Sequence, residues 1–363
     1  MKKYVALLLA LCLSLTGCAL VPPKTTMPTE APTTEATAAL TTEETTEPTT
    51  EPAPVYTNPL NGETLDTPYT GRVVAVTVSN IRDALPHYGT MGADILMEMW
   101  VNGSIIRDLA LFTDITKAQE IGSVRSVRPM FNQLVKHYDA VLLDASGSDQ
   151  ALGHAKSLGV ERINVDTYDG TDYSYRKMDR DFTFKPASKL EHCLFVKPEG
   201  VEALLTEKGY ATQQPEDKDY GLQFTENGTP ADGEAAGTVT VTFTYRNNKK
   251  DTSMVYDESL GKYVYNQYET PMVDGSTGNP ECFTNVIVML ADISMDGIYY
   301  TANFTNGGTG YFANGGKLVP ITWTCDGDEA PFRFFTQDGK PLQLGVGNTY
   351  MALAPEGSPV SYE

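Results

Sequence analysis

The spacing of apolar residues changes near residue 200, and this change limits the folds open to the chain more than any other feature. Before that point, apolar runs typical of buried strands alternate with helical patterns. After it, short strands follow one another, separated by Gly and Asn turns. We therefore predict an α/β or α+β N-terminal domain with a mixed sheet, followed by a smaller, mainly β C-terminal domain.

The first half alternates between strands and helices. We expect strands at 72–78, 94–100, 105–112, 140–143 and 162–165, and helices at 129–138, 150–158 and 198–208. Asn102-Gly103 between the second and third strands is a strong signal for a tight turn. Pro129 is tolerated in the first turn of a helix, and Gly159 and Gly209 are typical helix ends.

The second half begins after a polar, Gly- and Pro-rich stretch that ends at Gly237. Residues 238–245 alternate strictly between polar and apolar, as a half-buried strand does. We expect further short strands at 284–290, 298–304, 318–324, 332–335 and 349–353. About 306 residues follow residue 57, which suits two domains, and we place them at 58–209 and 210–363.

Residues 1–18 have the pattern of a bacterial lipoprotein signal peptide. Lys2 and Lys3 precede an apolar run at 5–15 that is too short to span a bilayer as a mature helix. Leu15-Thr16-Gly17-Cys18 then predicts cleavage before Cys18, which would carry acyl chains such as palmitate and anchor the protein at the extracytoplasmic face of the cell membrane. The alternative is an ordinary secretory signal with an accidental cysteine.

Thr, Pro, Glu and Ala dominate residues 19–57. Such a segment has almost nothing apolar to bury, so burial cannot offset the entropy cost of ordering it. Proline and like charges also extend a chain. We predict a disordered, Gram-positive-type tether that holds the folded part away from the membrane.

The formal net charge is −20, which repels nucleic acid at long range and disfavours it as a partner. Beyond the signal segment lie Cys193, Cys282 and Cys325, without a CxxC pair or a metal-like spacing, and the four histidines are scattered. We therefore expect no metal and no cofactor. Either Cys282 and Cys325 pair outside the cell, or all three cysteines are buried free thiols.

A series of segments extends over nearly all of residues 58–355. Its members are 58–62, 74–80, 93–98, 122–129 and 138–140, then 256–257, 261–263, 285–288, 308–317 and 322–323. In this order they resemble the YerB-like family of bacterial lipoproteins, and Arg125-Ser126-Val127-Arg128-Pro129 is the most specific segment. The family has two domains and no assigned biochemical activity, so the resemblance implies a fold and a location but no chemistry.

Arg125 and Arg128 are the best candidates for ligand contact. They lie just before a predicted helix, where free backbone N–H groups and the helix dipole favour an anion. A guanidinium also offers a rigid fork that suits a carboxylate or a phosphate. The alternative is that the two arginines form internal ion pairs, with the partner drawn from Asp94, Glu98, Asp108 and Asp139.

Ser146-Gly147-Ser148-Asp149 lies between a predicted strand and a predicted helix, where open α/β sheets often bind ligands. The alternative is a plain helix N-cap by Ser148 or Asp149. If both loops lie at one edge of the sheet, Arg125, Arg128, Ser146 and Ser148 would converge on one crevice.

Three further residues complete the candidate set. Glu98 and Arg107 lie on the two arms of the predicted hairpin, where we expect a cross-strand pair on an exposed face. Asn80 ends the first strand and is interpreted as a turn residue or as a ligand donor.

Catalytic signatures such as GxSxG, HExxH, a Walker loop and GxGxxG are absent from the sequence. The leading hypothesis is a non-catalytic, lipid-anchored binding protein for a small anionic or cell-wall-derived ligand, or for a protein partner in the envelope. One alternative is an extracytoplasmic hydrolase of cell-wall polymer with Glu98 or Asp94 as general acid or base. The other is a structural scaffold without a ligand.

Overall fold

The computed structural model describes residues 55–363. The predicted signal peptide 1–18, with its lipidation site Cys18, and residues 19–54 of the predicted tether lie outside the described residues. Two residues of the predicted tether belong to the folded part, because strand β1 (Tyr56–Thr57) pairs with β2 (Thr64–Leu65).

Within the described part, a central sheet of 13 strands forms the framework. In spatial order its main path is β12 (Glu234–Ala235), β22 (Lys317–Thr324), β21 (Gly308–Asn314), β18 (Asn285–Ala291), β25 (Thr349–Pro355), β4 (Ile95–Asn102), β5 (Ile105–Phe112), β3 (Val74–Ser79), β7 (Val141–Asp144) and β8 (Arg162–Asn164). Strands β19 (Ile293–Asp296), β20 (Tyr299–Ala302) and β23 (Arg333–Thr336) pair off this path.

The central sheet is mixed. Strands β3, β7 and β8 run parallel to one another, β5 is antiparallel to both β3 and β4, and β4 runs parallel to β25 and β18. Strands β3, β4, β7 and β8 therefore all finish at the same edge of the sheet. Open mixed sheets commonly bind ligands at such an edge.

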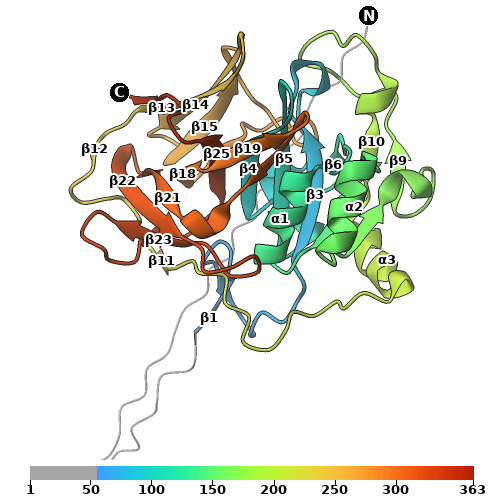
Figure 1. Ribbon diagram of the computed structural model, residues 1–363, viewed down its shortest axis with the longest axis horizontal. Helices are drawn as coiled ribbons and strands as arrows, with labels where there is room; N and C mark the ends of the chain where they lie inside the picture. Colours follow the sequence, from blue (N-terminus) through green and yellow to red (C-terminus); the bar gives the residue numbers. More distant parts are fainter. Residues whose placement is uncertain (1–54) are drawn as a thin grey trace, which may run out of the picture. The chain divides into compact units, whose positions relative to one another are not determined.

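Three α-helices and seven 3-10 turns occur in the described residues. Helices α1 (Pro129–His137) and α2 (Asp149–Ser157) lie beside β3 in Figure 1, and α1 buries Met130, Phe131 and Leu134. Helix α3 (Val201–Lys208) ends at Gly209, whose φ of 72° suits glycine. The 3-10 turns are η1 (Arg82–Ala84), η2 (Thr90–Gly92), η3 (Ile115–Lys117), η4 (Val165–Tyr168), η5 (Leu190–His192), η6 (Pro198–Gly200) and η7 (Phe304–Asn306).

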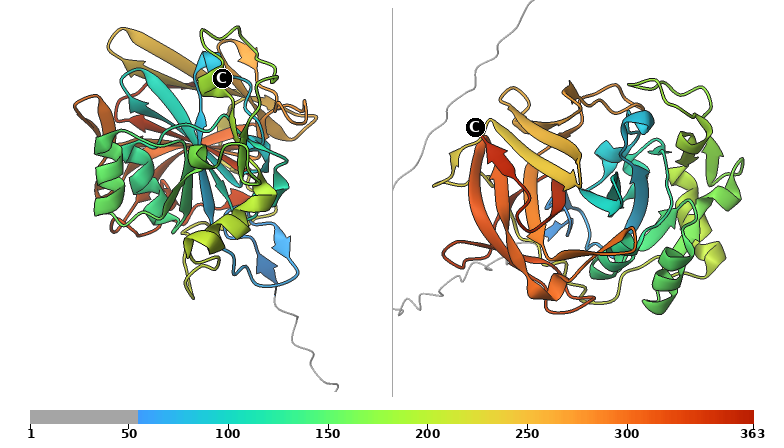
Figure 2. Two further views of the ribbon diagram at one scale, coloured as in Figure 1. Left: turned by 90° about the vertical axis from the view of Figure 1, so that its right-hand side faces the viewer. Right: turned by 45° about the horizontal axis from the view of Figure 1, so that its top comes forward.

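A second sheet packs against the face of the central sheet opposite the helices (Figure 2). It contains β16 (Thr270–Pro271), β15 (Lys262–Gln267), β14 (Asn248–Asp257), β13 (Thr238–Tyr245), β26 (Val360–Tyr362) and β17 (Cys282–Phe283). Aromatic rings fill the space between the sheets: Tyr265 lies 5.3 Å from Tyr350 between ring centroids, and Phe243 lies 6.2 Å from Trp100.

Two smaller sheets complete the described strands. One contains β6 (Ile121–Gly122), β10 (Leu194–Val196) and β9 (Ser174–Arg176), and the other pairs β11 (Phe224–Thr225) with β24 (Leu344–Gly345).

The predicted fold class is confirmed, because a mixed sheet with few helices is followed by a strand-rich second half. The two sequence halves also share the central sheet, since β4 from the first half pairs with β25 from the second over five residue pairs. The sequence pattern gave no indication of this pairing. Strands β14, β15 and β21 were likewise absent from the prediction.

Candidate functional site

Two loop segments lie side by side where β3 and β7 finish. The backbone N–H of Val127 donates to the Ser146 carbonyl at 2.8 Å, and that of Ala145 donates to the Arg125 carbonyl at 3.0 Å. The Arg125 N–H in turn donates to the Thr77 carbonyl of β3 at 3.0 Å. The structure thus brings the arginine segment and the serine segment to one edge of the sheet.

Glycine is required where the two segments meet. A Cβ atom on Gly147 would lie 2.7 Å from Cγ1 of Val127, which is closer than carbon atoms approach. Ser146 adopts a φ of 63°, in the left-handed region that few non-glycine residues occupy. The close approach of the two segments therefore depends on glycine at position 147 and on the left-handed backbone of Ser146.

Arg125 is partly exposed and pairs with Glu191. Its Nη2 lies 2.9 Å from Oε2 of Glu191, and its Nη1 donates to the Glu191 carbonyl at 2.6 Å. The predicted partners, Asp94, Glu98, Asp108 or Asp139, are wrong for Arg125. Arg125 is nevertheless held by an internal ion pair, as the alternative interpretation expected.

Arg128 has polar contacts but no carboxylate partner among residues 55–363. Its Nε donates to Oδ1 of Asn102 at 3.1 Å, and its Nη1 donates to the Val127 carbonyl at 2.7 Å. The guanidinium also lies over the Tyr299 ring, 5.5 Å from the centroid. Burial lowers the pKa of Arg128, and the neighbouring Arg125 acts in the same direction.

Arg107 completes a cluster of three guanidiniums, which we call the arginine cluster: Arg107, Arg125 and Arg128. The side chain of Arg107 is buried, and its Nη1 donates to the Ser126 carbonyl. Its Nε has no partner, and Arg107 forms no ion pair within the described residues. Burial holds the pKa of Arg107 well below its usual range, and the charges of Arg128 and Arg125 lower it further.

The two candidate serines differ in their bonding. The Oγ of Ser148 accepts from the Ala151 N–H at 3.2 Å, so Ser148 is the N-cap of α2, as the alternative interpretation expected. Ser146 is half-buried beside it. Ser123, on the other segment, has a buried Oγ without a partner.

Glu98 and Arg107 do not form the expected cross-strand pair. Glu98 lies opposite Asp108, while Arg107 lies opposite Met99, so the two side chains point to opposite faces of the sheet. The register shifts between Trp100 and Asn102, and a one-residue shift moves side chains to the other face. Both residues are buried, so the prediction of an exposed face is also wrong.

Glu98 instead belongs to a buried polar network between the two sheets. It forms an ion pair with Lys250 of β14 and accepts hydrogen bonds from Thr252 and Tyr350. Asn80 is buried as well, and its Nδ2 donates to Oε1 of Glu98 at 3.0 Å and to Oδ1 of Asp108 at 2.8 Å. Asn80 is therefore an internal bridge, neither a turn residue nor a donor open to a ligand.

The network continues through His87. Its Nε2 lies 3.4 Å from Oδ2 of Asp108, and its Nδ1 lies 3.2 Å from Oε2 of Glu281. Burial lowers the pKa of His87, but Glu281 and Asp108 outweigh burial and the net shift is upward. Burial raises the pKa of the Asp108 carboxyl to about 8. Residues of both sequence halves thus share one network.

Both carboxylates of the hydrolase alternative are engaged by protein groups. Glu98 is 0% exposed. Asp94 accepts four hydrogen bonds from Asn58, Asn61 and Thr113. A general acid or base must reach the proton that it transfers, and these two groups are enclosed by protein donors.

Arg107 was not predicted as a member of the arginine cluster, and His87, Lys250 and Glu281 were not predicted at all. No motif marks these residues, since their proximity arises from strand register and from the packing of the two sheets.

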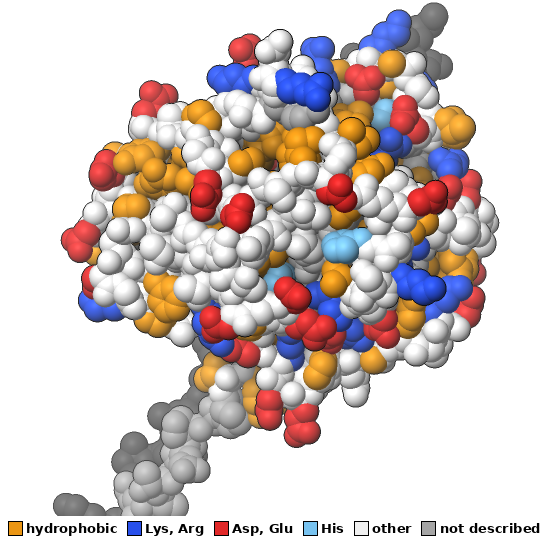
Figure 3. All heavy atoms as spheres, viewed as in Figure 1, with side chains coloured by type: hydrophobic (Ala, Val, Ile, Leu, Met, Phe, Trp, Pro, Cys, Tyr) orange, Lys and Arg blue, Asp and Glu red, His pale blue; other side chains and the backbone are white. Residues whose placement is uncertain are grey.

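The described cysteines are free thiols. Cys193 and Cys325 are buried and Cys282 is half-buried, so the Cys282–Cys325 disulfide is not formed. In residues 55–363 no group of three or more His, Cys, Asp or Glu side chains could hold a metal ion. No described helix is both long enough and apolar enough to cross a membrane. Figure 3 shows acidic side chains scattered over one face, with Lys and Arg side chains among them.

Comparison with known proteins places this fold in a family. The N-terminal domain of a protein family of unknown function, DUF3048, matches residues 60–211, and its C-terminal domain matches residues 239–351. The chain therefore belongs to the DUF3048 family.

A relative from Bacillus subtilis agrees with this assignment. The chain is 26% identical over 303 residues to YerB, which is named as a lipoprotein, covering 82% of this chain and 86% of that protein. The crystal structure of YerB superposes with a TM-score of 0.69 at 24% identity, covering 84% of this chain and 99% of the YerB chain. The predicted resemblance to the YerB-like family is thereby confirmed.

Proposed function

We propose that this protein is a lipid-anchored extracytoplasmic binding protein, and that its arginine cluster holds a small anionic ligand. One observation carries the proposal: Arg107 and Arg128 lie together at the strand ends, and neither meets a carboxylate among the described residues. The ligand class is a carboxylate or phosphate compound of the envelope, including cell-wall fragments.

The energetics of charge burial support an anion at this place. Removing a cation from water costs several kcal/mol unless an opposite charge compensates it, and carbonyl and amide oxygens compensate only partly. A bound anion at the partly exposed Arg128 would offset the repulsion among the three guanidiniums, including the buried Arg107. The Ser146 hydroxyl on the adjacent segment supplies a further donor.

The predicted location agrees with this role. The signal pattern ending in Cys18 predicts an acylated N-terminus, and the relative from Bacillus subtilis is named as a lipoprotein. An anchored binding protein needs reach from the membrane surface, which an extended segment at 19–57 would supply.

The test is a thermal-unfolding screen of the full-length chain in detergent against inorganic phosphate, small dicarboxylates and soluble cell-wall fragments. A ligand at about 100 times its dissociation constant stabilises a folded protein by roughly 2.7 kcal/mol. We expect Arg128→Gln to abolish that stabilisation. Arg333→Gln is the matched control, because Arg333 is exposed and already paired with Asp219.

The proposal fails if no compound stabilises the chain, or if Arg128→Gln and Arg333→Gln respond alike to the compound that does. A loss of basal stability in Arg128→Gln without any ligand effect would assign the arginine cluster a structural role.

A further inference from the structure

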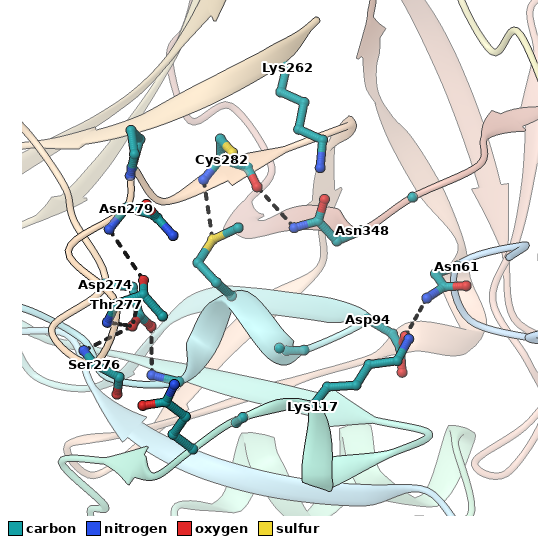
Figure 4. Close-up of a pocket in the computed structure, with 18 of the residues that line it drawn as sticks. Asn61, Asp94, Lys117, Lys262, Asp274, Ser276, Thr277, Asn279, Cys282 and Asn348 are labelled. Atoms are coloured by element: carbon teal, nitrogen blue, oxygen red, sulfur yellow. Dashed lines mark hydrogen bonds between the residues drawn. The ribbon is translucent and has the colours of Figure 1, made fainter. Parts of the chain in front are cut away.

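A pocket lies at the end of the central sheet opposite the arginine cluster. It has a volume of about 570 Å³, which is within the range of small-molecule sites. Asp94 and Asn348 line it just before β4 and β25 begin, whereas the arginine cluster lies where β3 and β7 finish. Lys262 and Cys282 line it from the second sheet (Figure 4), so both sequence halves build it.

The carboxylates of this pocket are already occupied by protein donors. Oδ1 of Asp94 accepts from the amides of Asn58 and Asn61, and Oδ2 accepts from the Thr113 N–H and hydroxyl. Asp274 accepts backbone N–H groups at 2.6 to 3.0 Å from Gly89, Ser276 and Thr277. These two acids therefore offer little to a cation, and they serve to fix the loops around the pocket.

The cationic and hydroxyl side chains of the pocket have fewer protein partners than its carboxylates. Lys117 pairs with Glu63 at 2.8 Å, but Lys262 has no ion pair in the described part of the chain. In Figure 4 the Lys262 side chain extends from β15 toward Asn348. The Oγ of Ser276 is buried and also lacks a partner. Ser276 lies on the far side of the pocket from Lys262 in Figure 4, so the Lys262 ammonium alone is the group left to meet a carboxylate.

The rest of the lining suits a short peptide chain. Met91, Ala93 and Leu260 supply apolar surface, and the exposed side-chain amide of Asn279 can bond peptide groups. The Asn348 amide is already bonded to the backbone of Cys282 and Thr284. We propose that this pocket binds a short peptide with a free C-terminal carboxylate, held by Lys262. This site is separate from the arginine cluster and does not depend on the function proposed there.

The test is calorimetric titration of the full-length chain in detergent with N-acetyl-dialanine. The dipeptide is used with either L- or D-alanine at its C-terminus, and each form is used as the free acid and as the C-terminal amide. We expect the acid to bind at least tenfold more tightly than its amide. Preference for the D form would indicate a wall-derived peptide, and preference for the L form an ordinary protein fragment.

Variants separate this site from the arginine cluster. Lys262→Met should weaken binding of the acid at least tenfold, while Lys262→Arg should stay within a few-fold of the parent. Lys249→Met is the matched control, because Lys249 lies on the neighbouring strand with 61% of its side chain exposed. Arg128→Gln should leave peptide binding unchanged, so the two proposals can fail independently.

Unfolding curves of Lys262→Met confirm that the variant is folded before titration. Absence of binding by all four peptides, equal binding of acid and amide, or full binding by folded Lys262→Met would each overturn the proposal.

Discussion

Glu98 and Lys250 place opposite charges in direct contact where solvent hardly reaches either side chain. Burying such a pair costs desolvation energy, which the attraction between the charges and additional hydrogen bonds must offset. Asn80, Thr252 and Tyr350 supply those bonds to Glu98. Because Glu98 belongs to the central sheet and Lys250 to the second sheet, the pair fixes the position of one sheet against the other.

Removing one charge of this pair should destabilise the fold. We expect Lys250→Met to lower the free energy of unfolding by about 3–5 kcal/mol, since Glu98 would remain buried without its counter-charge. The double variant Glu98→Gln with Lys250→Met should lose less than the sum of the two single losses. Urea denaturation of the four proteins measures the coupling, and strictly additive losses would show that the pair does not interact.

A second residue-scale prediction concerns pH. Burial lowers the pKa of His137 from 6.5 to about 4, and its Nδ1 lies 2.7 Å from the Ala330 carbonyl. The unfolded chain takes up this proton as the pH falls below about 6.5, whereas the folded chain does not until about 4, so stability decreases in that window.

Between pH 7 and pH 5, we therefore expect the free energy of unfolding to fall by about 2 kcal/mol more in the parent than in His137→Gln. Unfolding in urea at the two pH values measures this difference. An equal loss in the parent and in His137→Gln would contradict the assignment.

At the scale of elements, the loop between β7 and α2 has a structural role in addition to its proposed contact with a ligand. Ser148 caps α2, and Gly147 permits contact with Val127. The segment 146–149 therefore fixes both the start of α2 and the position of the segment that carries Arg125 and Arg128. Substitutions that distort this loop should lower both stability and binding, whereas a substitution of Ser148 should affect mainly the helix.

Ser148→Ala should lower the free energy of unfolding by about 1 kcal/mol, because the Ala151 N–H would lose its acceptor. Ser148→Asp, which keeps a capping oxygen, should recover most of that loss. Chemical denaturation of the three proteins tests this, and an equal loss in both variants would show that the cap is not the cause.

The elements that could be predicted from sequence are those with a clear apolar pattern. Strand β5 was predicted with its observed bounds at 105–112. Strand β14 was not predicted, because its inward positions carry the polar residues Lys250 and Thr252. Strand β21 contains Gly308 and Gly310, which weaken a strand pattern, yet a Cβ on Gly310 would lie 2.0 Å from the Val288 carbonyl oxygen.

Only part of the candidate site could be predicted, because not all of its residues follow a pattern in the sequence. The order of strand, loop and helix suggested that the Arg125 and Ser146 segments share an edge, and they do. Arg107 could not be placed, because the register shift in the β4–β5 hairpin reverses the face that its side chain occupies. A shift of this kind depends on tertiary packing and leaves no mark in the sequence pattern.

At the scale of the whole described part, the sheet that both sequence halves share is the dominant feature. Strand β25 inserts between β4 and β18, so the first half supplies one neighbour and the second half the other. The aromatic layer between the two sheets adds contacts from both halves. An arrangement of this kind couples the halves, although the family domains are matched separately along the sequence.

We therefore expect the two halves to unfold together. The chain has two tryptophans, Trp100 in β4 and Trp323 in β22, so Trp100→Phe and Trp323→Phe each leave one reporter. Each variant should show a fluorescence transition that coincides with its own far-ultraviolet circular dichroism transition. A fluorescence transition separated from the circular dichroism in either variant would indicate independent halves.

The most direct test of the proposed function is a crystal structure of the chain grown with selenate, a divalent oxyanion that gives an anomalous signal. We predict an anomalous peak within hydrogen-bond distance of Arg128, close to the Ser146 hydroxyl. Selenate absent from that edge of the sheet, with Arg128 contacting only protein atoms, would contradict the proposal.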